Sequence, residues 1–532
     1  MAKRLKFWGW GYEGDELSEA ERKFVLGNYA KTFGVSEFDW IPVPAEADIA
    51  LGKPRLAPPQ KLAAICSTAQ HDRLTHTYGK SFPDAVKTFA RDFANAPDVV
   101  AYAKNEDDVA AVFDWAAGAK AAVIPFGGGT SVVGGVEPAV PARFAGTVSL
   151  DLTGLDKVLE VDRTSRCARI QGGIRVPALE AQLKDKKLTL RHFPQSFEMA
   201  TLGGMIATRS GGHFATLYTH IDDFVESTRS LTPSGVLESR RLPGSGAGPS
   251  PDRFMMGAEG ALGVITEAWM RLQDRPTFRA AAAVFYEDIY AGAEAIRAIS
   301  QSGLFPSNVR LLDPAEARMN GFGDGRRAVM VLAFESADHP LEAWMARALA
   351  IARELGGEYD EAAAKNPDSH KEGAAGAWRN AFIRMPFNRE IITRAAVLND
   401  TFETAITWDR FRRFHDEVKA AVQKALKEAT GREGVVTCRF THVYPDGPAP
   451  YFTFHSLSRH GALLEHWRHV KQAASDAVIR EGGTITHHHA VGRDHMPWYV
   501  QQRPALFGEA LAAAKARLDP AGILNPGVIV PA

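Results

Sequence analysis

The sequence predicts an α+β protein of more than one domain. Its 532 residues, of which 45% are hydrophobic and 23% charged, are enough to form several hydrophobic cores. Short apolar segments typical of strands alternate with amphipathic helical segments, and a glycine-rich turn directly follows one of the apolar segments. The formal net charge of −1 and the lack of a basic stripe argue against binding to nucleic acid.

Residues 1–90 are expected to form a helical N-terminal extension. Polar segments compatible with helices are interrupted by the proline-rich stretch 43–59, which indicates an extended connector. No apolar run reaches signal-peptide length near the start, and none approaches the roughly 18 residues of a spanning helix. The three cysteines, Cys66, Cys167 and Cys438, lie far apart and favour a reducing compartment over a disulfide framework.

Residues 91–275 are expected to form an α+β domain that binds a cofactor. The segment 97–103 has the composition of a strand, Asn105 can cap the helix that follows, and the apolar run 121–126 completes a βαβ unit. Short strands with tight turns come next. A helix starting near Pro177 and a final strand at 264–272 close this region.

Residues 276–480 are expected to form a cap domain, an antiparallel sheet covered by helices. Apolar segments such as 328–335 and 435–444 alternate with charged helical segments such as 409–429. The last segment, 481–532, carries a run of histidines and ends in a tail rich in proline and glycine. We expect this tail to return to the cofactor domain.

Three consecutive glycines, Gly127, Gly128 and Gly129, follow the strand that ends at Phe126. Because glycine has no Cβ atom, their backbone N–H groups can turn toward one point, which suits a pyrophosphate. The segment lacks the lysine of a nucleoside-triphosphatase loop and the GxGxxG spacing of a Rossmann site. On its own, the triplet is equally consistent with a tight turn.

Two further segments, at 193–212 and 257–268, stand at the spacings of the other cofactor segments of vanillyl-alcohol-oxidase-like flavoproteins. The chain resembles this FAD-binding class, which combines a two-subdomain PCMH-type FAD-binding domain with a cap domain. In that class the first loop contacts the FAD pyrophosphate, and the other two follow the ribityl chain and the isoalloxazine edge. Many relatives bind FAD covalently through a histidine after the glycines. Thr130 and Ser131 stand there in this chain, so the resemblance implies non-covalent FAD.

The resemblance implies cofactor-binding roles for the residues that match these segments. They are Pro125, Phe126, Gly127, Gly128, Gly129, Thr130, Ser131, Gln195, Ser196, Phe197, Glu198, Met199, Ala200, Thr201, Gly203, Gly204, Thr208, Arg209, Ser210, Gly211, Glu259, Gly260, Ala261, Leu262, Gly263, Val264 and Ile265.

An ordered series of motifs makes the resemblance closest to the alkyldihydroxyacetonephosphate synthase family, in a bacterial-type form. The motifs are FWGWGY, RHFPQSFEMATLGG, FETAITWDR, TCRFTHVY, THHHAVGR and DPAGILNP. In that family a tyrosine takes a proton from C1 of acyl-dihydroxyacetone phosphate, flavin N5 captures this carbon, and a fatty alcohol replaces the acyl group. The matching tyrosine is Tyr451, the matching phosphate-binding residue is Arg389, and Arg310 matches a further arginine important for activity. From the residues alone, Arg389 can equally be a solvated helix residue, and Arg310 can pair with Asp313.

The run His487, His488 and His489 is expected to lie on a strand, with the first and third side chains on one side and the second on the other. All three belong to the implied catalytic set. His488 and His489 are expected to tune Tyr451 or to position the leaving carboxylate. Three adjacent histidines are awkward ligands for tetrahedral zinc, and no CxxC or HExxH pattern accompanies them, so no metal is expected. Ordinary core or surface histidines are the structural alternative.

Departures from the family pattern leave the substrate open. HHHG becomes HHHAVG here, and Tyr451 is followed by FTFHSLSRHG. The first alternative is an FAD-dependent dehydrogenase or oxidase of a 2-hydroxy acid or an alcohol. The second is a flavin-free protein that binds a metal or another ligand. The long peroxisomal presequence of animal versions is not seen before FWGWGY, so we expect a cytoplasmic enzyme. Peripheral contact with the inner face of a membrane and a homodimer are left open.

Overall fold

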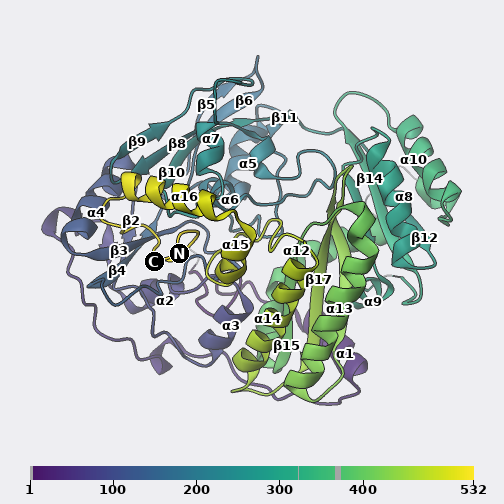
Figure 1. Ribbon diagram of the computed structural model, residues 1–532, viewed down its shortest axis with the longest axis horizontal. Coiled ribbons are helices and arrows are strands. Elements are labelled where there is room, and N and C mark those ends of the chain that lie inside the picture. The colour runs from purple at the N-terminus through teal and green to yellow at the C-terminus, as the bar shows by residue number, and fades with distance from the viewer. Residues whose placement is uncertain (1–3, 322, 366–372) are drawn as a thin grey trace.

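The computed structural model describes residues 4–321, 323–365 and 373–532, and it confirms the α+β class. The described strands form four sheets, with the sheets of the N-terminal half on the left of Figure 1 and the largest sheet on the right. No helix among the described residues is long and apolar enough to cross a membrane.

The first sheet positions the glycine-rich loop. Its strands, in spatial order, are β1 (Cys66–Ser67), β2 (Val99–Tyr102), β4 (Gly146–Asp151) and β3 (Ala121–Phe126). Strands β2 and β3 run parallel to β4, and α4 (Glu106–Gly118) connects β2 to β3. The side chain of Asn105 accepts a hydrogen bond from the backbone N–H of Asp108, so the predicted cap is confirmed. Since β3 ends at Phe126, the three glycines emerge at the carboxyl edge of this sheet.

The second sheet carries the other two cofactor segments. Its strands, in spatial order, are β5 (Val158–Asp162), β6 (Cys167–Gln171), β10 (Val264–Arg271), β8 (Val225–Thr232) and β9 (Gly235–Glu238). The helices packed on it are α5 (Val176–Lys184), α6 (Leu202–Thr208) and α7 (Pro251–Met255). A two-stranded ribbon of β7 (Leu188–Thr189) and β11 (Gln273–Asp274) lies beside them. The C-terminal segment joins the first sheet, because Asn525 N–H donates to the carbonyl of Val123.

The largest sheet is antiparallel and has six strands. In spatial order they are β12 (Phe278–Tyr286), β14 (Ala328–Ser336), β13 (Asn308–Leu312), β16 (Val435–Val443), β17 (Pro448–Leu457) and β15 (Val397–Glu403). The helices that cover one face are α8 (Ile289–Gln301), α10 (Glu342–Glu354), α13 (Trp408–Thr430) and α14 (Leu463–Arg480). This face therefore matches the predicted sheet covered by helices.

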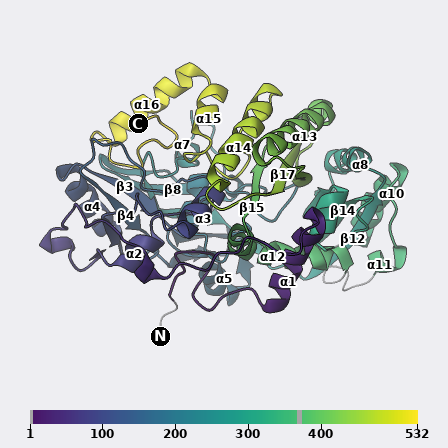
Figure 2. The same ribbon diagram turned by 90° about the horizontal axis from the view of Figure 1, so that it is seen from below.

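The opposite face of the six-stranded sheet is polar where it faces the first half of the molecule. In β17 the side chains of Phe452 and Phe454 enter the core under the helices, whereas Tyr451, Thr453 and His455 point the other way. Below this face lie α1 (Glu19–Phe33) and α12 (Gly373–Arg394), as Figure 2 shows. The remaining helices are α2 (Gln70–Thr75), α3 (Phe82–Phe89), α9 (Pro314–Met319), α11 (Glu361–Lys365), α15 (Met496–Gln502) and α16 (Ala505–Leu518).

Candidate active site

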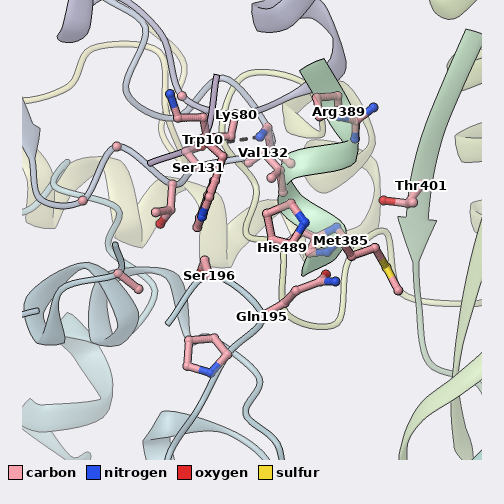
Figure 3. A pocket seen from close by; sticks show the side chains of 18 of the residues that line it. Trp10, Lys80, Ser131, Val132, Gln195, Ser196, Met385, Arg389, Thr401 and His489 are labelled. Atoms are coloured by element: carbon pink, nitrogen blue, oxygen red, sulfur yellow. Dashed lines mark hydrogen bonds between the residues drawn. The ribbon is translucent and has the colours of Figure 1, made fainter. Parts of the chain in front are cut away.

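A cavity of about 780 Å³ lies where the polar face of the six-stranded sheet meets the cofactor segments. Its walls come from the N-terminal segment, the three cofactor segments, α12, the polar face of the sheet and the histidine run. Figure 3 shows Ser131, Gln195, Arg389, Thr401 and His489 around this space, each contributed by a different stretch of chain. The fold therefore brings together residues that are more than 300 positions apart in the sequence.

The first cofactor segment approaches its neighbours too closely for side chains. A Cβ atom on Gly127 would lie 2.2 Å from Thr201 Oγ1, and one on Gly128 would lie 1.9 Å from the carbonyl oxygen of Met199. Gly129 has a φ of +64°, which favours glycine. None of the described hydrogen bonds uses the backbone N–H groups of residues 127–131. These donors line the cavity and suit the anionic pyrophosphate of FAD, so the residues present fit the cofactor.

The third segment is tied to the C-terminal part of the chain. Both carboxylate oxygens of Glu259 accept backbone hydrogen bonds, from the N–H of Val491 at 2.8 Å and of Gly492 at 2.8 Å. The side-chain amide of Asn525 donates to the carbonyl of Glu259 at 2.7 Å and to that of Gly135 at 3.0 Å. Asn525 thus clamps the third segment to the residues that follow the first.

The cavity is lined by most residues of the three predicted cofactor segments. They are Pro125, Phe126, Gly127, Gly128, Gly129, Thr130, Ser131, Gln195, Ser196, Ala200, Thr201, Gly203, Gly204, Thr208, Ser210, Gly211, Glu259, Gly260, Gly263, Val264 and Ile265.

Six other residues of these segments lie behind the lining. Phe197, Ala261 and Leu262 pack among hydrophobic residues. Met199 packs against Trp10 and Phe387. Arg209 pairs with Asp222 at 2.8 Å, and Glu198 follows Phe197 outside the cavity wall. None of these six residues lines the cavity, and their contacts with FAD stay predictions.

We expect Gly128→Ala to remove most of the bound FAD. The new Cβ atom would meet the carbonyl oxygen of Met199, so the loop would have to move. Overpacking of this kind costs about 1–3 kcal/mol, which corresponds to a loss of about 5- to 150-fold in affinity. Flavin absorbance after dialysis measures the effect. The matched control is Gly27→Ala in α1, where a Cβ atom meets nothing within 4 Å. Full flavin content in Gly128→Ala would contradict the assigned role of this loop.

Tyr451 lies at the centre of the polar sheet face, between two charged neighbours. The strand register places it opposite Glu403 of β15 and opposite Arg439 of β16. The Arg439 guanidinium lies 4.1 Å from the centre of the Tyr451 ring, and the Tyr451 hydroxyl donates to Thr401 Oγ1 at 3.0 Å. Burial raises the pKa of Tyr451, and Arg439 opposes this rise. Arg439 is therefore the cation best placed to favour a phenolate.

The histidine run does not form a strand, so that prediction is wrong. The chain bends around the buried carboxylate of Glu403, which accepts the backbone N–H groups of His487, His488 and His489 at 2.7, 3.0 and 2.9 Å. The hydroxyl of Thr486 adds a fourth hydrogen bond to it, at 2.5 Å. Because one acceptor collects three successive N–H groups, the backbone curls instead of extending. His488 and His489 consequently line the cavity together, while the side chain of His487 points away from it.

The side chains of His488 and His489 contact the Tyr451 ring and not its hydroxyl. The ring of His488 stacks at 6.3 Å between ring centres, and the ring of His489 meets it edge-on at 5.5 Å. Burial alone would raise the pKa of Glu403, but its contacts with the histidine run, that with His488 first, hold it well below its usual range. Burial lowers the pKa of His489 to about 3, so this imidazole is neutral at neutral pH.

His487 belongs to a second cluster with Tyr444, His220 and His442. Its Nε2 lies 2.7 Å from the Tyr444 hydroxyl, and its Nδ1 lies 2.9 Å from Nδ1 of His488. Ligand atoms of His442, His487 and His488 come within 4.8 Å of one another, close enough to raise the question of a metal ion. However, Nε2 of His442 lies 3.0 Å from the carbonyl oxygen of Gly212 and must donate to it. The arrangement of the described imidazole nitrogens thus fits a hydrogen-bonded chain better than a set of metal ligands.

Both predicted arginines line the cavity. Arg310 of β13 is buried, with its Nε donating to Asn308 Oδ1 at 3.1 Å, and burial lowers its pKa to about 9. Arg389 of α12 donates to the carbonyl of Asn399 and pairs with Asp400 at 3.2 Å. It is therefore held in place and is not a solvated surface residue.

Several residues of the site were missed by the sequence analysis, chiefly Glu403, Arg439, Tyr444 and His442. A usable signal existed for Arg439. Along β16 it lies two positions from Thr437 and from Thr441, so the three side chains share the polar face. Glu403 stands in the motif FETAITWDR, but nothing in its local pattern shows that its carboxylate would meet the histidine run. Its role depends on contact with residues more than 80 positions away.

The fold and the cavity define a flavoprotein of the FAD-linked oxidase type. Residues 97–239 match the FAD binding domain family, and residues 275–529 match the family of FAD linked oxidases, C-terminal domain. FAD is accordingly the cofactor.

Three similar proteins narrow this class. Over 480 residues the chain is 30% identical to alkyldihydroxyacetonephosphate synthase of Dictyostelium discoideum, covering 86% of this chain and 77% of that protein. A solved structure of an alkyldihydroxyacetonephosphate synthase has the same fold, with a TM-score of 0.79, 24% identity and coverage of 98% and 99% of the two chains. Glycolate oxidase subunit GlcD of Bacillus subtilis is 25% identical over 446 residues, covering 82% of this chain and 89% of the relative. The chain belongs to the alkyldihydroxyacetonephosphate synthase family of FAD-linked enzymes.

Proposed function

We propose that the protein exchanges the acyl group of acyl-dihydroxyacetone phosphate for a fatty alcohol, with FAD bound non-covalently. One observation carries this proposal: Tyr451, His488 and His489 line the same cavity as the three FAD segments. The name of a relative that is 30% identical over 480 residues supports an alkyl-dihydroxyacetone phosphate product. The chemistry of the cavity supports it in three ways, through its cations, its buried phenol and its apolar wall.

Arginine guanidinium groups give the cavity its affinity for a phosphate ester. Arg310, Arg389 and Arg439 all line it. With a pKa near 9, Arg310 still carries its charge at neutral pH. A guanidinium can donate two parallel hydrogen bonds to phosphate oxygens, which fixes the orientation of the substrate as well as its charge. We assign the phosphate contact to Arg389, because it lies on α12 at the edge of the sheet face that carries Tyr451.

Tyr451 is the group we assign to remove the C1 proton of the substrate. Its hydroxyl is oriented by Thr401, and Arg439 stabilises negative charge on the ring. Bound FAD supplies an electrophilic ring nitrogen and an electron sink. His489, neutral at neutral pH, can accept a hydrogen bond or donate one to the leaving carboxylate. The sheet face and the histidine run therefore provide a base, a cation and a donor that line one cavity.

One wall of the cavity is apolar and can take hydrocarbon chains. It is formed by Leu17, Phe24 and Val25 of the N-terminal segment together with Met319 and Ile392. The Phe24 side chain is 54% exposed, so this wall reaches the surface. We therefore propose that lipid chains enter along α1, and that the protein makes peripheral contact with a membrane surface there.

The direct test mixes purified flavoprotein with palmitoyl-dihydroxyacetone phosphate and hexadecanol and measures the products by mass spectrometry. The proposal predicts the hexadecyl ether and free palmitate in equal amounts. Absence of ether over a range of chain lengths would contradict it. Bleaching of the flavin by glycolate or D-lactate without added alcohol would instead identify a hydroxy-acid dehydrogenase.

Arg389→Gln should raise KM for the phosphorylated substrate by about 10- to 150-fold, because a hydrogen bond to a charged group contributes about 1.5–3 kcal/mol. KM for the same substrate without its phosphate should change little. Steady-state kinetics on both substrates measures the difference. Arg347→Gln on the exposed side of α10 is the matched control. An equal effect on both substrates would exclude a phosphate contact.

A further inference from the structure

A chain of hydrogen-bonded groups runs from the cavity wall toward the surface of the cap. It starts at His488, which lines the cavity. Nδ1 of His488 lies 2.9 Å from Nδ1 of His487, and Nε2 of His487 lies 2.7 Å from the hydroxyl of Tyr444. That hydroxyl in turn lies 3.1 Å from Thr219 Oγ1 and 3.4 Å from Nδ1 of His220.

The far end of this chain is close to solvent. Tyr444 begins the turn between β16 and β17, in which Pro445 and Asp446 are exposed. His220 is partly exposed and follows the exposed residues Leu217 and Tyr218. The chain thus connects the buried reaction site with the outside of the molecule through His487 and Tyr444.

The hydrogen-bond partners set a direction for proton movement. Nε2 of His220 lies 2.9 Å from the carbonyl oxygen of His487, and because a carbonyl only accepts, this nitrogen carries a proton. Nδ1 of His220 is therefore an acceptor for the Tyr444 hydroxyl. At the other end, the carboxylate of Glu403 lies 3.3 Å from Nδ1 of His488 and stabilises a proton there. Burial raises the pKa of Tyr444, so it remains a phenol that can accept one proton while donating another.

The proposed reaction releases one proton inside the cavity. The bond between C1 and the acyl oxygen breaks, a bond between C1 and the alcohol oxygen forms, and the acyl group leaves as a carboxylate. The proton taken from C1 returns to C1, so the alcohol O–H proton is the surplus one. Because the hydrocarbon chains of both substrates would fill the side of the cavity that reaches the surface, this proton needs another route to solvent.

We propose that His488, His487 and Tyr444 carry the alcohol proton from the cavity to the partly exposed His220. His488 accepts it at Nε2, the ring nitrogen that the described contacts leave for the cavity, and releases the Nδ1 proton to His487. His487 then passes its Nε2 proton to Tyr444, whose own hydroxyl proton moves to Nδ1 of His220. The imidazolium of His220 loses a proton to water at its partly exposed ring. His488 is a catalytic residue in this scheme, and Tyr444 acts only through His487. The inference rests on the proposed function.

The test compares Tyr444→Phe with the wild-type holoenzyme in two assays. Ether formation should fall at least about tenfold in kcat, which is less than the 10² to 10⁴ of a direct acid or base because Tyr444 acts through His487. KM and flavin content should stay unchanged, and the solvent deuterium isotope effect should be larger. Exchange of the C1 hydrogen with D2O in the absence of alcohol should stay at the wild-type rate, because that proton passes through Tyr451. Tyr286→Phe on the distant strand β12, whose buried hydroxyl has no hydrogen-bond partner among the described residues, is the matched control.

The two assays distinguish a proton relay from a disturbed site and from a metal site. A kcat within twofold of wild type would overturn the relay, and so would a parallel fall of C1 exchange and ether formation, since that pattern indicates a disturbed site. Loss of wild-type activity on chelation and its return with zinc would replace the relay by a metal site at the same histidines. If the wild-type protein forms no ether at all, the proposed function fails first.

Discussion

Tyr451→Phe is expected to lower the rate of acyl-to-alkyl exchange by about 10² to 10⁴, the usual contribution of a positioned general base. The ring would keep its place beside Arg439 and on the strand, because only the hydroxyl and its hydrogen bond to Thr401 are lost. Flavin content and thermal stability should therefore remain close to wild type. Exchange of the C1 hydrogen with D2O, followed by NMR, measures the defect at the step where it arises.

A small effect of Tyr451→Phe would exclude Tyr451 as the base. If Tyr451→Phe keeps both ether formation and C1 exchange within threefold of wild type, another group removes the proton. Thr401→Val provides a graded comparison, since it removes only the acceptor that orients the phenol. We expect it to lie between the wild type and Tyr451→Phe.

Glu403→Gln is expected to break hydrogen bonds that hold the backbone of His487, His488 and His489 in place. An amide offers one oxygen where the carboxylate accepts hydrogen bonds from Thr486 and from three successive backbone N–H groups. At least two of these donors would lose their partner, at about 1–3 kcal/mol each. Hydrogen exchange of the amides of residues 487–489 should therefore accelerate by about 30-fold or more. Ether formation should fall with it, because His488 and His489 would no longer be held at the cavity wall.

The ionisation of Glu403 should also appear in the pH dependence of stability. Its pKa in the folded protein lies well below its usual range, so its stabilising contribution is complete above the unfolded value of about 4.3 and is lost as the pH falls through the folded value. The stability difference between wild type and Glu403→Gln should shrink in that acidic range. Glu294→Gln on the exposed side of α8 should show no such trend and should change stability by less than about 0.5 kcal/mol. A constant difference between pH 7 and pH 3 would argue against an ionised Glu403.

Local patterns predicted most of the fold. The alternation of Tyr451, Thr453 and His455 with Phe452 and Phe454 is what a strand with one buried face requires, and it also marks which side chains face the cavity. The charged segment beginning at Trp408 forms α13, with its apolar positions in the core of the cap. The domain boundaries near residues 90, 275 and 480 stay predictions.

Long-range contacts account for what the sequence could not predict. The stretch around His488 has the composition of a strand, but Glu403 collects its N–H groups and bends it. The pairing of Arg439 with the Tyr451 ring depends on the register of β16 and β17, which the turn between them sets and which the alternation within one strand does not specify. The resemblance to a family identified the cofactor segments, and the folded chain shows why Gly128 in particular has no room for a side chain.

We expect FAD, Tyr451 and the arginines that line one cavity to carry out an exchange without net oxidation. The most direct measurement follows the flavin spectrum under anaerobic conditions while palmitoyl-dihydroxyacetone phosphate and hexadecanol are consumed, with no electron acceptor present. We expect many turnovers of ether product per flavin and a flavin that is fully oxidised at the end. Reduction of the flavin after a single turnover, with no ether formed, would contradict it.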